Sequence, residues 1–201
     1  AALQRLDIDA DLEALRDADL VAEDFFTIEN GRMPIRDRPA AEQEAFRLRY
    51  GDDPQIRLLQ ADALRETGQA DAADKIYAGL LNGSQAAAAW HGTGLIAASR
   101  GDYARGETAL AKAVQLEPLN ISYLGDLGFA RLRAGDVARA HDPLARAAEL
   151  APGNPKATAN LALWTLLSGD QAKAEAIMQG AKLPDASRQA VLQLARTLRA
   201  Q

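Results

Sequence analysis

From about residue 54 onward, apolar residues recur every three or four positions, the spacing that places them on one face of an α-helix. These segments come in pairs, and in three of the pairs the dipeptide Gly-Asp separates the two halves. Gly101, Gly135 and Gly169 begin these dipeptides, and successive members lie 34 residues apart. Because a helix-turn-helix unit has about this length, the pattern predicts a stack of helix pairs.

The predicted chain has three parts. Residues 1–53 do not follow the repeat, residues 54–188 hold four helix pairs, and residues 185–201 form a final helix. Val191, Leu194 and Leu198 lie on one side of that helix, which is typical of a helix that covers the exposed end of a repeat array. The four predicted pairs occupy residues 54–86, 87–120, 121–154 and 155–188. The chain is therefore predicted to be all-α.

The recurring turn residues have mechanical roles. Glycine adopts the left-handed conformation that ends a helix without steric penalty, so the first helix of each pair is predicted to stop at the glycine of Gly-Asp. The following aspartate then caps the second helix. Pro118 and Pro152 close their units, and the small residues at 94, 128 and 162 allow paired helices to approach closely.

Two positions depart from the repeat. Pro143 falls inside the second helix of the unit 121–154, where it cannot donate to the carbonyl of Arg139. We expect a kink there, and we interpret the residue as a proline that is tolerated on a convex outer helix. In the last unit, proline stands at 184 rather than 186, so the second helix of that unit should stop early.

The first 53 residues are acidic, with 14 Asp and Glu against 7 Lys and Arg. Residues 9–23 and 40–50 are predicted to be short helices, and the stretch between them is predicted to be irregular. Three interpretations stay open: this segment attracts a basic partner, folds over the repeats, or is simply solvated.

The repeat pattern resembles the tetratricopeptide repeat family, whose signature is Trp, Leu-Gly, Ala and Pro at fixed positions of a 34-residue unit. The matching residues are Trp90, Gly94 and Pro118, then Leu127, Gly128, Ala140 and Pro152, and finally Leu161, Ala162 and Ala174. The resemblance implies a helical solenoid of helix-turn-helix repeats with a C-terminal capping helix and a non-repeat N-terminal segment. It is specific for the fold and says little about function.

In that family the first helix of each pair lines an inner, concave groove. Carried onto this chain, the resemblance places a mostly apolar set of residues there. Such a groove is typical of a site for a peptide or helix of a partner protein. The alternative is that Phe25, Phe26, Ile28 and Met33 of the same chain fill it. The predicted groove residues are His91, Leu95, Ala98, Ser99, Ser122, Phe129, Leu132, Arg133, Lys156, Leu163, Leu166 and Leu167.

The sequence gives little support for a metal site, a dinucleotide site, nucleic-acid binding or a membrane span. The chain has no cysteine, and its two histidines, His91 and His141, are 50 residues apart without ligands at metal spacing. Gly92, Gly94 and Ala97 match a dinucleotide-binding pattern, but a predicted helix precedes them where that motif requires a strand. We therefore predict a protein that is not an enzyme and needs no cofactor or metal. The sequence has no stripe of basic residues of the kind that binds nucleic acid. No apolar run is long enough to span a membrane.

The segment NLALWTLLSGDQAKAEAIMQGAKLPDASRQAVLQLA, residues 160–195, resembles the closing portion of the TadD-type lipoproteins of bacterial tight-adherence (Flp) pilus systems. This resemblance implies a pilotin-like role in assembling a secretin channel, at the periplasmic face of the outer membrane. The chain begins at Ala1 without methionine, so we expect any lipid-bearing cysteine upstream of it. The alternative is a helical accessory domain of a larger cell-envelope enzyme or another multi-domain enzyme.

Overall fold

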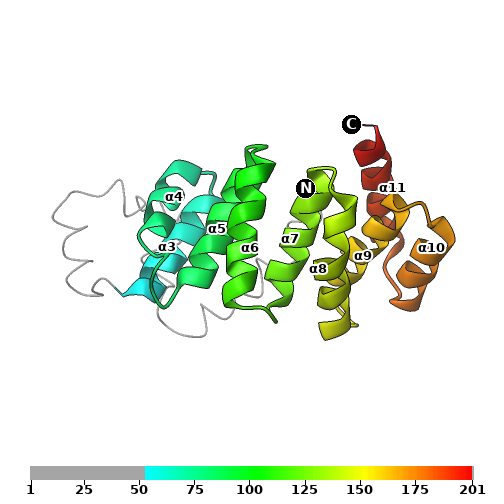
Figure 1. The fold of residues 1–201 in the computed structure, drawn as a ribbon, viewed down its shortest axis with the longest axis horizontal. Helices are drawn as coiled ribbons and strands as arrows, with labels where there is room; N and C mark the ends of the chain where they lie inside the picture. Colours follow the sequence, from blue (N-terminus) through cyan, green and yellow to red (C-terminus); the bar gives the residue numbers. More distant parts are fainter. Residues whose placement is uncertain (1–52, 201) are drawn as a thin grey trace, which may run out of the picture. The chain divides into compact units, whose positions relative to one another are not determined.

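The computed structural model describes residues 53–200. The chain divides into two units, Ala1–Gln60 and Ala61–Gln201, and the described residues from 61 onward, which hold most of the repeat array, lie in the second (Figure 1). The helices predicted at 9–23 and 40–50, and the aromatic residues between them, lie outside the described residues. Within the described part every regular element is an α-helix, which confirms the predicted all-α solenoid. These helices are α3 (Pro54–Glu66), α4 (Ala70–Ala78), α5 (Ala86–Ser99), α6 (Tyr103–Leu116), α7 (Ile121–Arg133), α8 (Val137–Leu150), α9 (Pro155–Leu167), α10 (Gln171–Gly180) and α11 (Asp185–Arg199).

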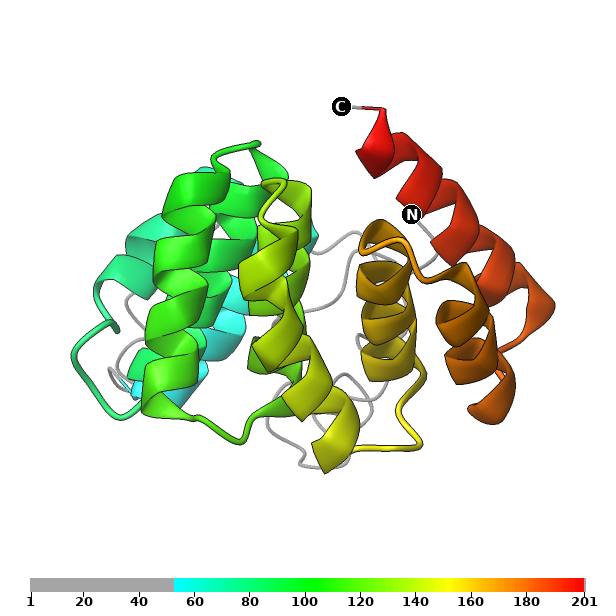
Figure 2. The same cartoon turned by 45° about the vertical axis from the view of Figure 1, so that its right-hand side comes forward.

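Successive helices pack against one another in pairs. Helix α5 packs on α6, α7 on α8 and α9 on α10, while α6 also contacts α7 and α8 contacts α9. The two views in Figures 1 and 2 show how the chain reverses direction at each turn, so that the first helices of the pairs run alike. Helix α11 packs against α9, in the place expected of a capping helix. Among the described helices, none is both long and apolar enough to cross a lipid bilayer.

The turn between the two helices of each pair has the predicted conformation. Its glycine is left-handed, which ends the first helix where a residue with a Cβ would be strained. The aspartate that follows Gly101, Gly135 or Gly169 accepts a hydrogen bond from the backbone N–H three residues later and caps the second helix. The φ angles are +80° at Gly68, +79° at Gly101, +78° at Gly135 and +95° at Gly169.

Small residues bring the paired helices close together, as predicted. A Cβ on Gly94 would lie 2.7 Å from Cγ of Leu110, and one on Gly128 would lie 2.4 Å from Cγ of Leu144. Both distances are shorter than real side-chain contacts, so neither position tolerates alanine without movement. In the last unit the corresponding residues are Ala162 and Met178. The flexible thioether side chain of methionine suits the site where a Cβ is present.

The second helices differ in length, and one of them, α8, contains a proline. Helix α10 has 10 residues, whereas α6 and α8 each have 14, so the predicted early stop of the last unit is confirmed. Helix α8 continues through Pro143 without a break. Pro143 itself is buried beside Leu144.

Candidate functional site

The predicted groove residues fall into three groups by exposure. Ser99 and Ser122 are exposed, seven others are half-buried, and three leucines are buried. All of them lie on the first helices α5, α7 and α9. We call the exposed and half-buried members together the first-helix face. They are His91, Leu95, Ala98, Ser99, Ser122, Phe129, Arg133, Lys156 and Leu167.

The three buried leucines do not belong to this surface. Leu132, Leu163 and Leu166 have exposed fractions of 2%, 2% and 4% and lie in one core cluster with Val191 of α11. Helix α11 packs against α9, and the Arg199 guanidinium donates to the carbonyl of Leu166. The capping helix thus covers positions of α9 that the repeat pattern alone assigns to the groove.

One edge of the first-helix face carries a ladder of charged and polar side chains that spans three repeats. Asp126 on α7 lies between His91 on α5 and Lys156 on α9. Its carboxylate is 2.7 Å from Nε2 of His91 and 3.3 Å from Nζ of Lys156. The ladder therefore ties each first helix to the next through a shared carboxylate.

The surroundings of Asp126 keep it ionised. Burial opposes the charged form, but the hydrogen bond from His91 and the positive charge of Lys156 outweigh it, so the pKa of Asp126 is lowered. Since an ionised carboxylate only accepts hydrogen bonds, Nε2 of His91 is the donor. The His91 ring also rests against Tyr123, with ring centroids 4.5 Å apart. Burial is the main cause that raises the pKa of the Tyr123 phenol to about 12.

Apolar side chains lie next to this ladder. Leu95 and Phe129 are half-buried and occupy the same position of successive repeats, on α5 and α7. Phe129 packs against the core cluster that contains Leu132. Gly125 lies close by on α7, and its carbonyl accepts from the amide of Asn160, with 3.5 Å between N and O. The first-helix face is thus apolar in part and polar along one edge.

The far end of α7 presents Arg133. Its Nη2 donates to the hydroxyl of Tyr103 at 2.9 Å, and the guanidinium lies over the Tyr103 ring, 5.6 Å from the centroid. Its Nε is buried and has no hydrogen-bond partner. No carboxylate among the described residues forms an ion pair with this guanidinium.

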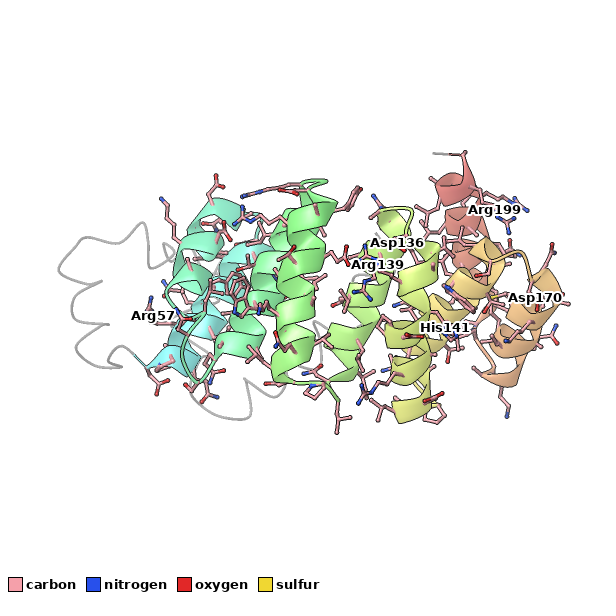
Figure 3. All side chains as sticks on the ribbon, in the orientation of Figure 1. Arg57, Asp136, Arg139, His141, Asp170 and Arg199 are labelled. Atoms are coloured by element: carbon pink, nitrogen blue, oxygen red, sulfur yellow. The ribbon has the colours of Figure 1, made fainter. Side chains whose placement is uncertain are left out.

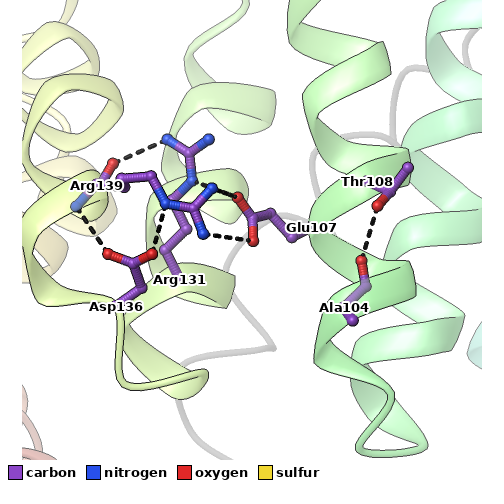
Figure 4. Close-up of polar contacts among 6 residues, drawn as sticks. All are labelled: Ala104, Glu107, Thr108, Arg131, Asp136 and Arg139. Carbon is purple, nitrogen blue, oxygen red and sulfur yellow. Dashed lines mark hydrogen bonds and ion pairs between the residues drawn. The ribbon is translucent and has the colours of Figure 1, made fainter.

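A second polar cluster joins α6, α7 and α8. Glu107 on α6 accepts from Nε of Arg131 at 3.0 Å and from Nη1 of Arg139 at 2.8 Å. Asp136, the cap of α8, also pairs with Arg139, and Figure 4 shows the whole cluster. Its cationic groups are all matched by oxygen acceptors, which is typical of a structural network.

His141 lies apart from the first-helix face, on α8 (Figure 3). Its side chain is 46% exposed, as expected for a surface residue. The ring lies against Trp164, tilted by 50° with centroids 4.4 Å apart, and Nδ1 lies 2.9 Å from the carboxylate of Asp142. His91 and His141 do not come together, and the described residues contain no group of three or more potential metal ligands.

The glycines of the rejected dinucleotide pattern have packing roles. Gly92 and Gly94 lie inside helix α5 rather than in a loop. A Cβ on Gly92 would approach Cζ of Tyr77 to 2.2 Å, so this glycine makes room for the buried tyrosine ring. The glycines are therefore explained by close helix packing, and no phosphate-binding turn is present at this motif.

Comparison with solved structures identifies the fold. YrrB, a TPR protein with an unusual peptide-binding site, is 19% identical, with a TM-score of 0.62 over 78% of this chain and 81% of its own. MamA of AMB-1 is 21% identical, with a TM-score of 0.54 over 65% of this chain and 77% of its own. The chain has the fold of the tetratricopeptide repeat (TPR) proteins.

The TPR fold also occurs in neighbours whose chains are much longer than this one. A variant of the Thermobaculum terrenum O-GlcNAc transferase is 27% identical, with a TM-score of 0.54 over 58% of this chain and 22% of its own. Human IFIT1, in a dimer with m7Gppp-AAAA, is 21% identical, with a TM-score of 0.59 over 71% of this chain and 35% of its own. No protein-family profile and no curated protein sequence matches the chain.

Proposed function

We propose that this TPR chain is a non-enzymatic scaffold whose first-helix face holds a segment of a partner protein, either an extended peptide or a helix. The observation that carries the proposal is the position of Leu95 and Phe129. Both are large apolar side chains, both are half-buried rather than sealed in the core, and both recur at one position of successive repeats. A partner side chain that packed against them would complete their removal from water.

The neighbouring polar groups support the same use of this face. His91, Asp126 and Lys156 are already held in place by contacts across three repeats, so a bound segment would meet a preorganised polar edge. A mixed surface of this kind suits recognition of a peptide, in which apolar contacts give affinity and polar contacts fix orientation. Among the neighbours of similar fold, YrrB is a TPR protein with a peptide-binding site.

Selection of peptides from a random display library on the immobilised full chain tests this proposal. We expect enrichment of peptides with large apolar side chains on the wild type, and loss of that enrichment on the double variant Leu95→Glu, Phe129→Glu. Leu116→Glu is the matched control, because Leu116 is an exposed leucine at the end of α6, away from the first-helix face. Circular dichroism confirms that each variant is folded. Equal enrichment on the wild type and the double variant would refute the proposed site.

The finer part of the proposal concerns the partner. Residues 160–195 resemble TadD-type lipoproteins, which supports a pilotin-like role with a secretin subunit as the bound protein, at the periplasmic face of the outer membrane. Co-expression with the secretin of a tight-adherence system tests this role. We expect co-purification that the double variant Leu95→Glu, Phe129→Glu abolishes and that Leu116→Glu leaves intact. Secretin recovery that is the same with and without the chain would contradict it.

A second candidate is a helical accessory domain of a larger enzyme. It is favoured by the likeness to the O-GlcNAc transferase variant, since the chain matches 22% of that protein's length. The coding sequence on both sides of the present chain distinguishes the two candidates. A catalytic segment in the same reading frame supports the accessory domain, whereas a lipoprotein signal directly before Ala1 supports the pilotin-like role.

A further inference from the structure

We propose that α11 is an internal ligand of the predicted groove: it occupies the end formed by α9 and can detach to admit a helix of the partner protein. This inference rests on the proposed function, because it concerns the same row of first helices. It also names the class of segment that replaces α11, an amphipathic helix whose apolar residues have the spacing found in α11.

One position of three successive repeats shows what α11 does. Leu95, Phe129 and Leu163 occupy this position on α5, α7 and α9. The first two are half-buried, whereas Leu163 is only 2% exposed. Helix α11 packs on α9 and contributes Val191 and Ala195 to the core cluster that contains Leu163. It therefore covers the third member of the row as a bound segment would cover the first two.

The position of α11 differs from that of a first helix in a regular repeat. Helix α7 packs on α6 and α9 packs on α8, each on the second helix of the preceding pair. Helix α11 instead packs on α9, the first helix of the preceding pair. Figure 2 shows α11 inclined to both α9 and α10. The chain thus places its last helix on groove positions of α9 rather than beginning another repeat with it.

The side chains of α11 follow the pattern of a helix bound in a groove. Val191, Ala195 and Leu198 have the spacing i, i+4 and i+7, and Leu194 lies beside them at i+3. The first two are buried, and the two leucines are half-buried and pack against the same core cluster. Grooves that bind amphipathic helices recognise apolar residues at this spacing. A partner helix with the same spacing therefore fits the site that α11 occupies.

The turn before α11 opposes its docked position. Lys182 has a φ of +53°, the left-handed conformation that glycine adopts in the earlier turns. The N–H of Leu183 donates to the carbonyl of Met178, and this hydrogen bond requires the left-handed residue between them. Because a residue with a Cβ is strained in this conformation, the turn offsets part of the stabilisation that docks α11. Release of α11 allows Lys182 to relax.

Exchange of α11 for a partner helix keeps the core cluster covered. Leu163 and Leu166 are shielded by α11 before the exchange and by the partner helix after it. Since α11 belongs to the same chain, its effective concentration at α9 is high, and a helix that contacts α9 alone competes poorly. A partner helix that also packs on Leu95 and Phe129 gains contacts that α11 does not make. The internal helix therefore selects for partners that bind along the whole row.

Fluorescence anisotropy with a labelled synthetic peptide of residues 185–200 tests whether α11 can be replaced. The full chain with Val191→Asp, Ala195→Asp is the opened variant, since buried carboxylates detach α11 and leave α9 intact. We expect the peptide to bind this variant at least about tenfold more tightly than the wild type, whose own α11 occupies the site. The same peptide with Val191→Asp is the matched control and should bind neither chain. Equal binding of the unchanged peptide to both chains, or to neither, overturns the inference.

A milder variant keeps the test decisive if circular dichroism shows that the opened variant is not folded. Val191→Ala weakens the docking of α11 without burying a charge, so it should also bind the peptide more tightly than the wild type does. Lys182→Gly in this background removes the strain of the turn and should weaken peptide binding by about threefold. Unchanged binding in both variants contradicts the inference.

Selection of display peptides on the opened variant tests the class of the partner. We expect enriched peptides with apolar residues at i, i+4 and i+7 that compete with the peptide of residues 185–200. Enriched peptides that lack this spacing, or that do not compete, overturn the inference. The proposed function fails separately: it is contradicted if Leu95→Glu, Phe129→Glu leaves selection on the wild type unchanged, whatever the peptide of residues 185–200 does.

Discussion

Arg131 supplies the hydrogen bond that Pro143 cannot make in helix α8. In a regular helix the N–H of residue 143 would donate to the carbonyl of Arg139, but proline has no N–H. Here Nη1 of Arg131, on the neighbouring helix α7, donates to that carbonyl at 2.8 Å (Figure 4). The same guanidinium pairs with Glu107 through Nε. The carbonyl therefore stays satisfied, and α8 continues through the proline.

This relationship predicts coupling between the two side chains. Arg131→Met should lower the free energy of unfolding by about 1–3 kcal/mol, because it leaves the Arg139 carbonyl without its donor and leaves Glu107 paired with Arg139 alone. In the Pro143→Ala background the restored N–H serves that carbonyl, so the same substitution should be less destabilising by roughly 1 kcal/mol. Urea unfolding of the wild type, both single variants and the double variant measures the difference. Additive changes across the four proteins would contradict the proposed role of Arg131.

The ladder at Asp126 predicts a dependence of stability on pH. Asp126→Asn should lower the free energy of unfolding at neutral pH by about 1–3 kcal/mol, since Lys156 and His91 lose their shared anion. The pKa of Asp126 is lower in the folded chain than in the unfolded chain, so the unfolded state binds the proton first as the pH falls. The stabilisation is complete above the ordinary carboxyl pKa of about 4 and is lost at lower pH.

Chemical unfolding between neutral and acidic pH measures this effect. The difference between the wild type and Asp126→Asn should shrink as the pH falls below about 4. Asp142→Asn is the control, because Asp142 is 96% exposed and its pair with His141 should contribute little. A difference for Asp126→Asn that stays constant over this pH range would contradict the assignment.

Two glycines of α7 predict opposite outcomes for the same substitution. A Cβ on Gly128 would lie 2.4 Å from Leu144, so Gly128→Ala should destabilise the chain by about 1–3 kcal/mol. Among the described residues, a Cβ on Gly125 would meet only Asn160, at 3.5 Å, so Gly125→Ala should be neutral or stabilise by up to about 1 kcal/mol through helix propensity. Thermal unfolding of both variants measures the contrast. Equal destabilisation by both would mean that close packing is not the reason for Gly128.

If α11 caps the repeat array, its buried side chains should shield the core cluster from water. Val191 is 2% exposed and lies in the cluster that contains Leu163 and Leu166. Val191→Asp should therefore expose that cluster, raise the binding of a hydrophobic dye and lower the melting temperature, because it buries an unpaired charge. Gln193→Asp, at an exposed position of the same helix, should change neither by much. Similar dye binding by both variants would argue against a capping function.

Much of the fold is predictable from short-range sequence signals. The left-handed glycines at 101, 135 and 169, the aspartate caps and the early end of α10 all depend on residues a few positions apart. The repeat period then determines which helices are neighbours. The uninterrupted course of α8 through Pro143 is not predictable in this way, because the Arg139 carbonyl accepts its hydrogen bond from Arg131 of another helix.

The candidate site is harder to derive from the sequence, since it depends on contacts between repeats. His91 and Asp126 are 35 residues apart, one more than the repeat, so they face each other on adjacent first helices. The offset of 35 residues could have predicted this pair, because it places the two residues on adjacent first helices. A search for metal-ligand spacing within a single helix does not detect it. The burial of Leu163 and Leu166 depends on where α11 docks, which the repeat pattern does not specify. Whether the remaining face binds a partner stays a prediction.

Hydrogen exchange of the full chain, with and without the most enriched selected peptide, tests the central claim most directly. If the peptide lies on the first-helix face, amide exchange should slow in α5 (Ala86–Ser99) and α7 (Ile121–Arg133), where Leu95 and Phe129 lie. The second helices α6 and α8 should change little. Protection confined to α6 and α8, with α5 and α7 unchanged, would contradict the account.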